Sequence, residues 1–162
     1  MTMQSARVEL HSKRSRLASL IQKVSDAPHT NLDPELSSHL ARYLVVRLCG
    51  DTEQSVRLLM SQYVKEHADS RVFQYFGKSW KRSQNITKET LKQLISALDL
   101  DWWETVENQY PDELDAFDSI YSSRNGIAHG DNQGITITTV IQYEQQVWTV
   151  LEFLDTLVEP VS

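Results

Sequence analysis

The chain has 162 residues, 40% of them apolar, and a net charge of −6, which together suit one soluble domain with a sizeable core. Five glycines and four prolines are too few for the turns of a strand-rich fold, and the single cysteine, Cys49, excludes an internal disulfide or a CxxC metal site. No apolar run approaches the ~18 residues of a membrane span, so we expect a cytoplasmic protein without a membrane partner.

Two long helices are predicted in the first half of the chain. Apolar residues repeat at helical spacing over residues 5–25, and the opposite face of this helix is basic. Asp33, Pro34 and Glu35 then have the order of an N-cap, a first-turn proline and a first-turn acid. The apolar pattern continues to about residue 68, which predicts a helix of roughly 50 Å at 1.5 Å per residue. We expect this helix to be central to the fold.

Shorter helices follow in the second half of the chain. Residues 71–85 mix aromatic and basic side chains and are partly helical in this interpretation, and residues 99–111 form a short acidic segment. Helices are expected over residues 87–98, with a threonine cap, and over 111–125. A last helix after Gly134 has a wide apolar face. The whole pattern predicts an all-α protein, an antiparallel helical bundle built on long helical hairpins with extra short helices.

Charge is unevenly distributed between the two parts of the chain. Residues 1–100 hold 15 Lys and Arg against 10 Asp and Glu, whereas residues 101–162 hold 1 against 12. Long solvated helices can differ in charge without any functional reason. The alternative is a basic surface for phosphate groups, for which residues 71–92 are the best placed.

The stretch SSRNGIAHGD, residues 122–131, groups an arginine, an asparagine and a histidine near a predicted helix end. On a regular helix, Asn125 and His129 would lie ~40° apart, whereas Arg124 and His129 would lie ~140° apart. Arg124 and His129 therefore converge only if the helix ends or distorts between them. Gly126 offers that freedom, and Gly130 is a plausible stop.

Arginine and histidine side chains are the components of metal-free phosphodiester cleavage. An imidazole can take a proton from a ribose 2′-hydroxyl or give one to the leaving 5′-oxygen near neutral pH. A guanidinium binds phosphate through two hydrogen bonds and stabilises the charge of the transition state. Asn125 could orient His129 or donate a further hydrogen bond. The structural alternative is a helix end where Arg124 and His129 meet the terminal carbonyls.

The run RNGIAH, residues 124–129, resembles the signature of HEPN domains, an arginine and a histidine separated by four to six residues. Residues 35–68 and 124–147 are similar to the RiboL-PSP-HEPN branch. This resemblance implies a single HEPN-like helical domain over residues 1–162, with the helix at 5–25 as an extension. It also implies a homodimer whose two motifs face one cleft.

The activity implied by the resemblance is that of a metal-independent endoribonuclease without a cofactor. Its products would carry 2′,3′-cyclic phosphate and 5′-hydroxyl ends, and a dimer would supply one histidine as base and another as acid. Such proteins often serve in toxin–antitoxin or phage-defence systems, so a cognate antitoxin or effector protein is a possible partner beside RNA. The tyrosine that is adenylylated in some HEPN toxins is replaced here by Asp131, so that switch is not expected.

Glu53 is a further candidate for the site. It lies midway along the second predicted helix on one face with Cys49, and proteins of the resembled family often place a polar residue there. Glu53 could pair with Arg124 or orient His129. The alternative is an exposed acid beside Arg57, one helical turn away.

Candidate RNA-binding residues are Lys78, Trp80, Lys81 and Arg82, which follow three aromatic residues. Single-stranded RNA surfaces combine aromatic rings that stack on bases with cations that hold phosphates. Aromatic residues are also the usual components of a core, so a packing role is the alternative.

Two classes of function remain. The first is the endoribonuclease, and the second is a catalytically silent HEPN module that dimerises or binds a partner protein or RNA. The enzyme requires the side chains of Arg124 and His129 to be accessible in a shared cleft, whereas the binding module does not. We favour the endoribonuclease.

Overall fold

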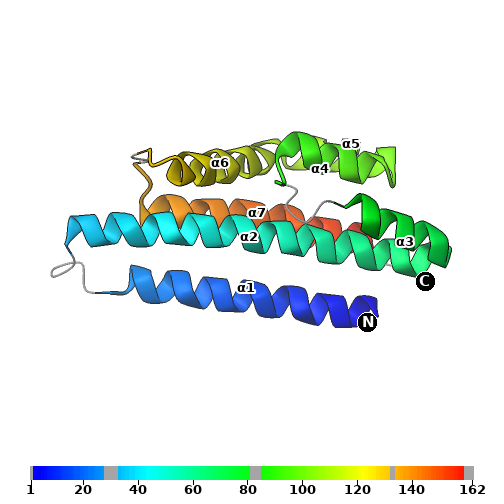
Figure 1. The fold of residues 1–162 in the computed structure, drawn as a ribbon, viewed down its shortest axis with the longest axis horizontal. Coiled ribbons are helices and arrows are strands. Elements are labelled where there is room, and N and C mark those ends of the chain that lie inside the picture. Colours follow the sequence, from blue (N-terminus) through cyan, green and yellow to red (C-terminus); the bar gives the residue numbers. More distant parts are fainter. Residues whose placement is uncertain (1, 28–32, 81–84, 132–133, 159–162) are drawn as a thin grey trace.

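The computed structural model describes residues 2–27, 33–80, 85–131 and 134–158. These residues form seven helices and no strand, which confirms the all-α class (Figure 1). In chain order the helices are α1 (Met3–Ser25), α2 (Pro34–His67), α3 (Ser70–Ser79), α4 (Lys88–Ser96), α5 (Leu100–Gln109), α6 (Pro111–Ala128) and α7 (Ile137–Leu157).

The four long helices form two hairpins, α1–α2 and α6–α7, that pack into one antiparallel bundle (Figure 1). Helix α2 contacts α1, α6 and α7, so it is the central element, as predicted. The short helices α4 and α5 cover α6, and α3 packs on α2. At one end of the bundle, on the left of Figure 1, α1 and α6 end and α2 and α7 begin.

Local sequence signals explain where the helices begin. The Asp33 carboxylate accepts a hydrogen bond from the backbone N–H of Glu35 at 3.0 Å, and Pro34 follows at the first helical position. The Thr87 hydroxyl accepts from the N–H of Thr90 at 3.2 Å. Both predicted caps are confirmed. Helix α2 continues through Gly50 without interruption.

The core lies between the four long helices. Trp148 and Phe117 are the largest side chains that are fully buried. Helix α1 contributes Leu10 and Leu17, which are 0% and 2% exposed. Burying each of these side chains stabilises the fold by about 1.5–3 kcal/mol, so α1 is an integral part of the bundle.

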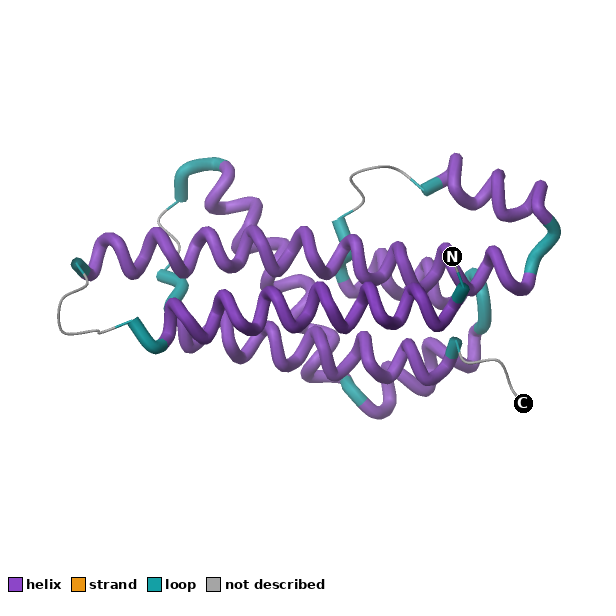
Figure 2. Tube along the Cα trace, turned by 90° about the horizontal axis from the view of Figure 1, so that it is seen from below, coloured by secondary structure: helices purple, strands orange, loops and turns teal. Residues whose placement is uncertain are grey.

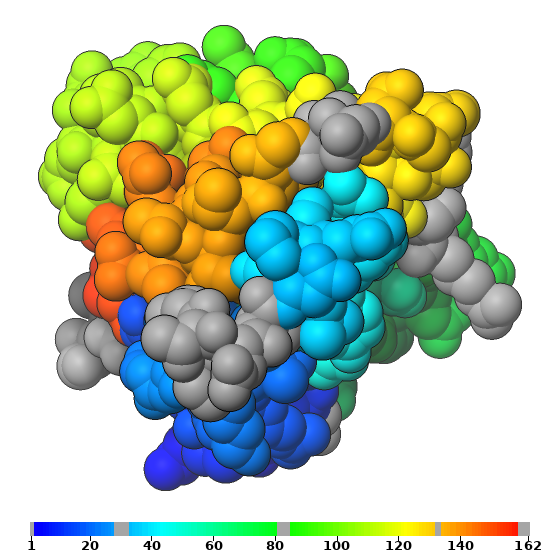
Figure 3. Space-filling model, turned by 90° about the vertical axis from the view of Figure 1, so that its left-hand side faces the viewer, coloured from blue at the N-terminus to red at the C-terminus, as the bar shows by residue number. Residues whose placement is uncertain are grey.

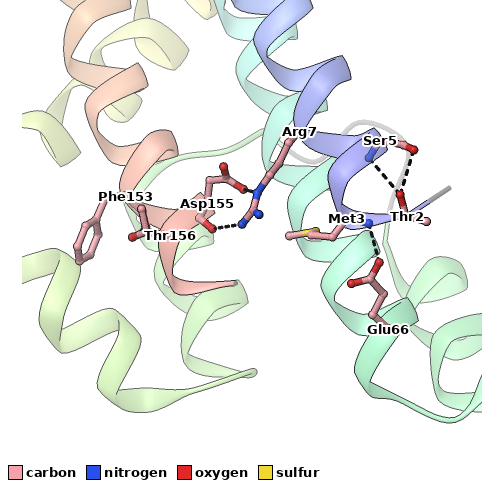
Figure 4. Close-up of polar contacts among 8 residues, drawn as sticks. All are labelled: Thr2, Met3, Ser5, Arg7, Glu66, Phe153, Asp155 and Thr156. Carbon is pink, nitrogen blue, oxygen red and sulfur yellow. Dashed lines mark hydrogen bonds and ion pairs between the residues drawn. The ribbon is translucent and has the colours of Figure 1, made fainter. Parts of the chain in front are cut away.

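Polar contacts attach the first half of α1 to its neighbours (Figure 4). The Arg7 guanidinium donates to the Asp155 carboxylate at 2.8 Å and to the Asp155 carbonyl at 3.0 Å. The backbone N–H of Met3 donates to the Glu66 carboxylate at 2.6 Å. These contacts join α1 to the last turns of α7 and of α2.

Helix α3 differs from the others because none of its residues is buried. It lies beside the last turns of α2, apart from the main bundle (Figure 2). No helix in the described part of the chain is both long enough and apolar enough to cross a lipid bilayer.

Candidate functional site

The end of α6 is defined by a glycine in the left-handed conformation. Gly130 has φ +81°, and its N–H donates to the Ile127 carbonyl at 3.1 Å. The N–H of Asp131 donates to the Gly126 carbonyl at 2.9 Å. These two bonds form a Schellman motif, which favours glycine at the left-handed position because glycine has no Cβ. The predicted stop at Gly130 is confirmed, and His129 is the last residue before it.

The distortion at Gly126 that would let Arg124 and His129 converge within one copy does not occur. Helix α6 runs without a break to Ala128, three residues past its predicted end, and Gly126 is buried within it. On this regular helix, Arg124 and His129 point ~140° apart and are separated by roughly 7.5 Å along the axis. Among the described residues, no hydrogen bond or ion pair joins the two side chains. A single copy therefore presents them on different faces.

Arg124 is half-buried and is held by the segment that precedes α4. Its Nη1 donates to the Oδ1 of Asn85 at 2.7 Å. Asn85 is half-buried beside Ile86, which is 3% exposed and packs into the core. No sequence signal pointed to Asn85, because its partner lies 39 positions away along the chain.

Glu53 lies on α2, close enough to Arg124 for an electrostatic interaction between the two side chains. Burial raises the pKa of the Glu53 carboxyl above its usual value, and the Arg124 guanidinium offsets part of this rise. Glu53 is half-buried, so the alternative of an exposed acid is wrong. We call Cys49, Glu53, Asn85 and Arg124 the α2–α6 cluster.

Cys49 is buried behind Glu53, and its Sγ lies 4.0 Å from the Oε1 of Glu53. Burial and the Glu53 charge raise the pKa of the Cys49 thiol to about 11, although Arg124 opposes them. The thiol therefore stays protonated at neutral pH and is a poor nucleophile. Its role in the cluster is packing.

His129 and Asn125 are exposed at the end of the bundle. The adjacent Gly130 borders an open groove of about 500 Å³ together with the first turns of α2, including His39 and Arg42. Figure 3 faces this end, where the end of α6 (gold) lies beside the start of α2 (light blue and cyan). Glu35 also lines this groove, 3.8 Å from the Nε2 of His39, so His129 lies next to a surface of mixed charge.

The candidate RNA-binding residues have three different outcomes. Lys78 is exposed on α3. Trp80 is only 7% exposed and packs with its ring centroid 5.5 Å from that of Phe76, so it cannot stack on a base and its assignment to an RNA surface is wrong. Lys81 and Arg82 lie outside the described residues. Tyr75, 73% exposed on α3, is the aromatic ring that is available there.

Among the described residues, no group of three or more His, Cys, Asp or Glu side chains could hold a metal ion. A family model described as RiboL-PSP-HEPN matches residues 9–160. No curated protein and no solved structure matches the chain.

Proposed function

The chain belongs to the RiboL-PSP-HEPN family, and from this membership we propose that it is a metal-independent endoribonuclease. The family match indicates a nuclease or an RNA-related module. The catalytic groups in the proposal are Arg124 and His129, with Asn125 beside the histidine. Glu53 acts as a positioning residue through its charge interaction with Arg124.

The observation that carries the proposal is the environment of Arg124. Its guanidinium is oriented by the neutral amide oxygen of Asn85, and no acid among the described residues forms an ion pair with it. The nearby Glu53 has a raised pKa, which reflects a cost of ionisation at this position. Arg124 is therefore fixed in place while its positive charge remains available for a phosphate.

A homodimer completes the proposed site, because one copy keeps Arg124 and His129 on different faces. The exposed face of α2 beside the cluster supports this arrangement: Val46 is 40% exposed, and a Cβ added to Gly50 would meet no atom within 4 Å. A second copy bound there about a two-fold axis would bring two motifs to one cleft.

In this cleft the chemistry needs only the side chains of the chain. One His129 takes the proton of the ribose 2′-hydroxyl, and the oxygen attacks the adjacent phosphorus. Arg124 stabilises the negative charge of the pentacoordinate phosphorane. The second His129 gives a proton to the leaving 5′-oxygen, which yields a 2′,3′-cyclic phosphate and a 5′-hydroxyl.

The biological setting in this proposal is a toxin–antitoxin or phage-defence system, with a cognate antitoxin or effector protein that restrains or triggers cleavage. Exposed Tyr75 and Lys78 on α3 are proposed RNA contacts. The second candidate function, a silent binding module, draws support from the separation of Arg124 and His129 in a single copy.

The test is cleavage of a panel of tRNA, ribosomal RNA fragments and single-stranded RNA in the presence of EDTA, with the product ends mapped. We expect the wild type and a His11→Ala control, which removes an exposed histidine from α1, to cut and to leave cyclic-phosphate ends. Arg124→Ala and His129→Ala should be inactive. Equal cutting by all four proteins, or none by any folded dimer, would contradict the proposed enzyme.

The dimer has a separate test. Val46→Glu places a charge on the proposed interface, whereas Val8→Glu makes the same change at a valine that is 67% exposed on α1. Light scattering should show monomers only for Val46→Glu, and cleavage should fall with the loss of dimers. Monomeric wild-type protein, or a Val46→Glu dimer, would overturn this interface.

A further inference from the structure

The cations of α1 divide into two groups. In one group, Lys13 lies 3.8 Å from Glu9 on the same helix, Arg7 pairs with Asp155, and Arg14 pairs with Glu152 and, at 3.7 Å, with Glu144. The charge of these cations is balanced within the fold, and the pairs of Arg7 and Arg14 join α1 to α7.

Arg16 and Lys23 form the other group. Both are exposed, and neither makes an ion pair with an acid among the described residues. The Nη2 of Arg16 donates to the Ser12 hydroxyl at 2.9 Å, one turn earlier on the same helix. Their positive charge is therefore directed to solvent.

A groove of about 560 Å³ between α1 and α2 brings these cations together with Arg47. Ser15 and Ser19 of α1 and Tyr43 of α2 also line it. The serines lie one turn apart on an exposed line of α1, and Tyr43 is 55% exposed. The groove thus offers cations, hydroxyl donors and one aromatic ring.

Among the residues that the structure describes, no acid lines this groove. The acid that pairs with Arg47 is Asp51, whose carboxylate accepts from the Nε of Arg47 at 3.2 Å. The Asp51 side chain is 7% exposed, whereas that of Arg47 is 51% exposed, so the guanidinium faces solvent while its acid is buried behind it. The surface of the groove is positive although the protein is acidic overall.

The groove lies at the end of the bundle where α6 ends (Figure 1). The later part of the chain, residues 101–162, holds 12 acids against 1 base, Arg124, so its surface outside the proposed site disfavours polyanions. A polyanion near this protein is therefore drawn to the α1–α2 side. Cations interleaved with an aromatic ring and hydroxyls are the features by which proteins bind single-stranded nucleic acid.

We propose that the α1–α2 groove binds the phosphate backbone of single-stranded RNA through Arg16, Lys23 and Arg47. The inference rests on the proposed function, because it names the surface that holds the proposed substrate. The groove acts in binding, and it leaves the chemical step to Arg124 and His129.

The test measures binding of a fluorescent single-stranded RNA to the His129→Ala protein, which removes the proposed general base. Arg16→Ala and Lys23→Ala are added together in this background. Arg57→Ala with Lys65→Ala, at two exposed residues of α2, is the control that removes the same charge. Thermal unfolding of both variants checks that each remains folded.

We expect the groove variant to bind RNA at least ~10-fold more weakly, and the control to change less than ~2-fold. The slope of log affinity against log salt should fall by about 0.7 for each lost phosphate contact. Equal affinity of the two variants would overturn the proposal, and it is also the outcome if the groove serves an acidic protein or an anionic membrane instead.

Failure of this proposal is distinguishable from failure of the proposed enzyme. If wild type cuts RNA and the groove variant binds like the control, the enzyme stands and the groove assignment is wrong. If wild type does not cut but RNA binding is lost with Arg16 and Lys23, the groove stands and the chain is a binding module.

Discussion

The two halves of α6 carry their charged side chains for different purposes. In the first half, Asp112 and Glu113 occupy the first turn, where acids stabilise the helix dipole. Asp118 accepts from the backbone N–H of Lys88 at 2.9 Å, and Asp115 pairs with the Lys88 ammonium, also at 2.9 Å. These acids help to start α6 and to attach α4.

The second half of α6 has the opposite character. No acid pairs with Arg124 within the described residues, and backbone hydrogen bonds around His129 and Gly130 form the end of the helix, so the His129 imidazole is not needed to cap it. Charged side chains in the first half of α6 therefore stabilise the fold, whereas those in the second half remain available to bind a ligand.

Among the variants that test this difference between the two halves of α6, His129→Ala should have the largest effect, which is on RNA cleavage. His129→Ala should lower the rate by ~100- to 10,000-fold, the usual contribution of a general acid or base. Its thermal unfolding should match wild type, because the exposed imidazole makes no hydrogen bond among the described residues. A loss of stability together with activity would show that the second half of α6 is also structural.

Gly130→Ala should have the next largest effect. A Cβ in the left-handed conformation costs about 1–2 kcal/mol, so the free energy of unfolding in urea should fall by about that amount. Gly134→Ala is the matched control, because a Cβ there meets no atom within 4 Å and no positive φ is required. An equal change in the two variants would contradict the Schellman ending of α6.

Asp118→Ala tests the first half of the helix. Loss of the hydrogen bond to Lys88 at the start of α4 should cost about 1 kcal/mol of unfolding free energy, as for other helix caps. Cleavage should be unchanged at temperatures well below unfolding. A variant of wild-type stability, or one that folds normally but does not cut, would remove the distinction between the two halves.

The smallest effect is expected from Glu53→Gln. Because the pKa of Glu53 is raised in the folded protein, the folded state holds this proton more tightly than the unfolded chain. The wild type therefore loses stability as the pH rises from the ordinary value of about 4.5 through the raised pKa, and glutamine does not. Glu53→Gln should be more stable than wild type at pH 7.

This advantage should shrink as the pH falls through the raised pKa toward the ordinary value of about 4.5, since the wild-type carboxyl then takes up a proton in the folded protein. Urea midpoints at the two pH values measure the change, and Glu104→Gln, at an exposed acid on α5, is the control. A Glu53→Gln protein that is less stable than wild type at pH 7 would mean that attraction to Arg124 outweighs the cost of burial.

Features that depend on neighbours in the chain were predicted correctly from the sequence. The caps Asp33 and Thr87 and the stop at Gly130 involve partners no more than five residues away, so the local order of residue types was sufficient. The sequence left open whether the helix breaks at Gly126, and it does not break there. A glycine within a helix costs only about 1 kcal/mol, and burial of this part of α6 against its neighbours outweighs that cost.

The sequence by itself determined the helical class, the long central helix, and the grouping of Arg124, Asn125 and His129 around one helix end, because helical periodicity and capping are local. Only the tertiary structure decided that Trp80 is buried, that Asn85 holds Arg124, and that Arg14 is paired while Arg16 pairs with no acid among the described residues. These outcomes depend on which helix faces come into contact across long separations, and residue order along a single helix does not specify that.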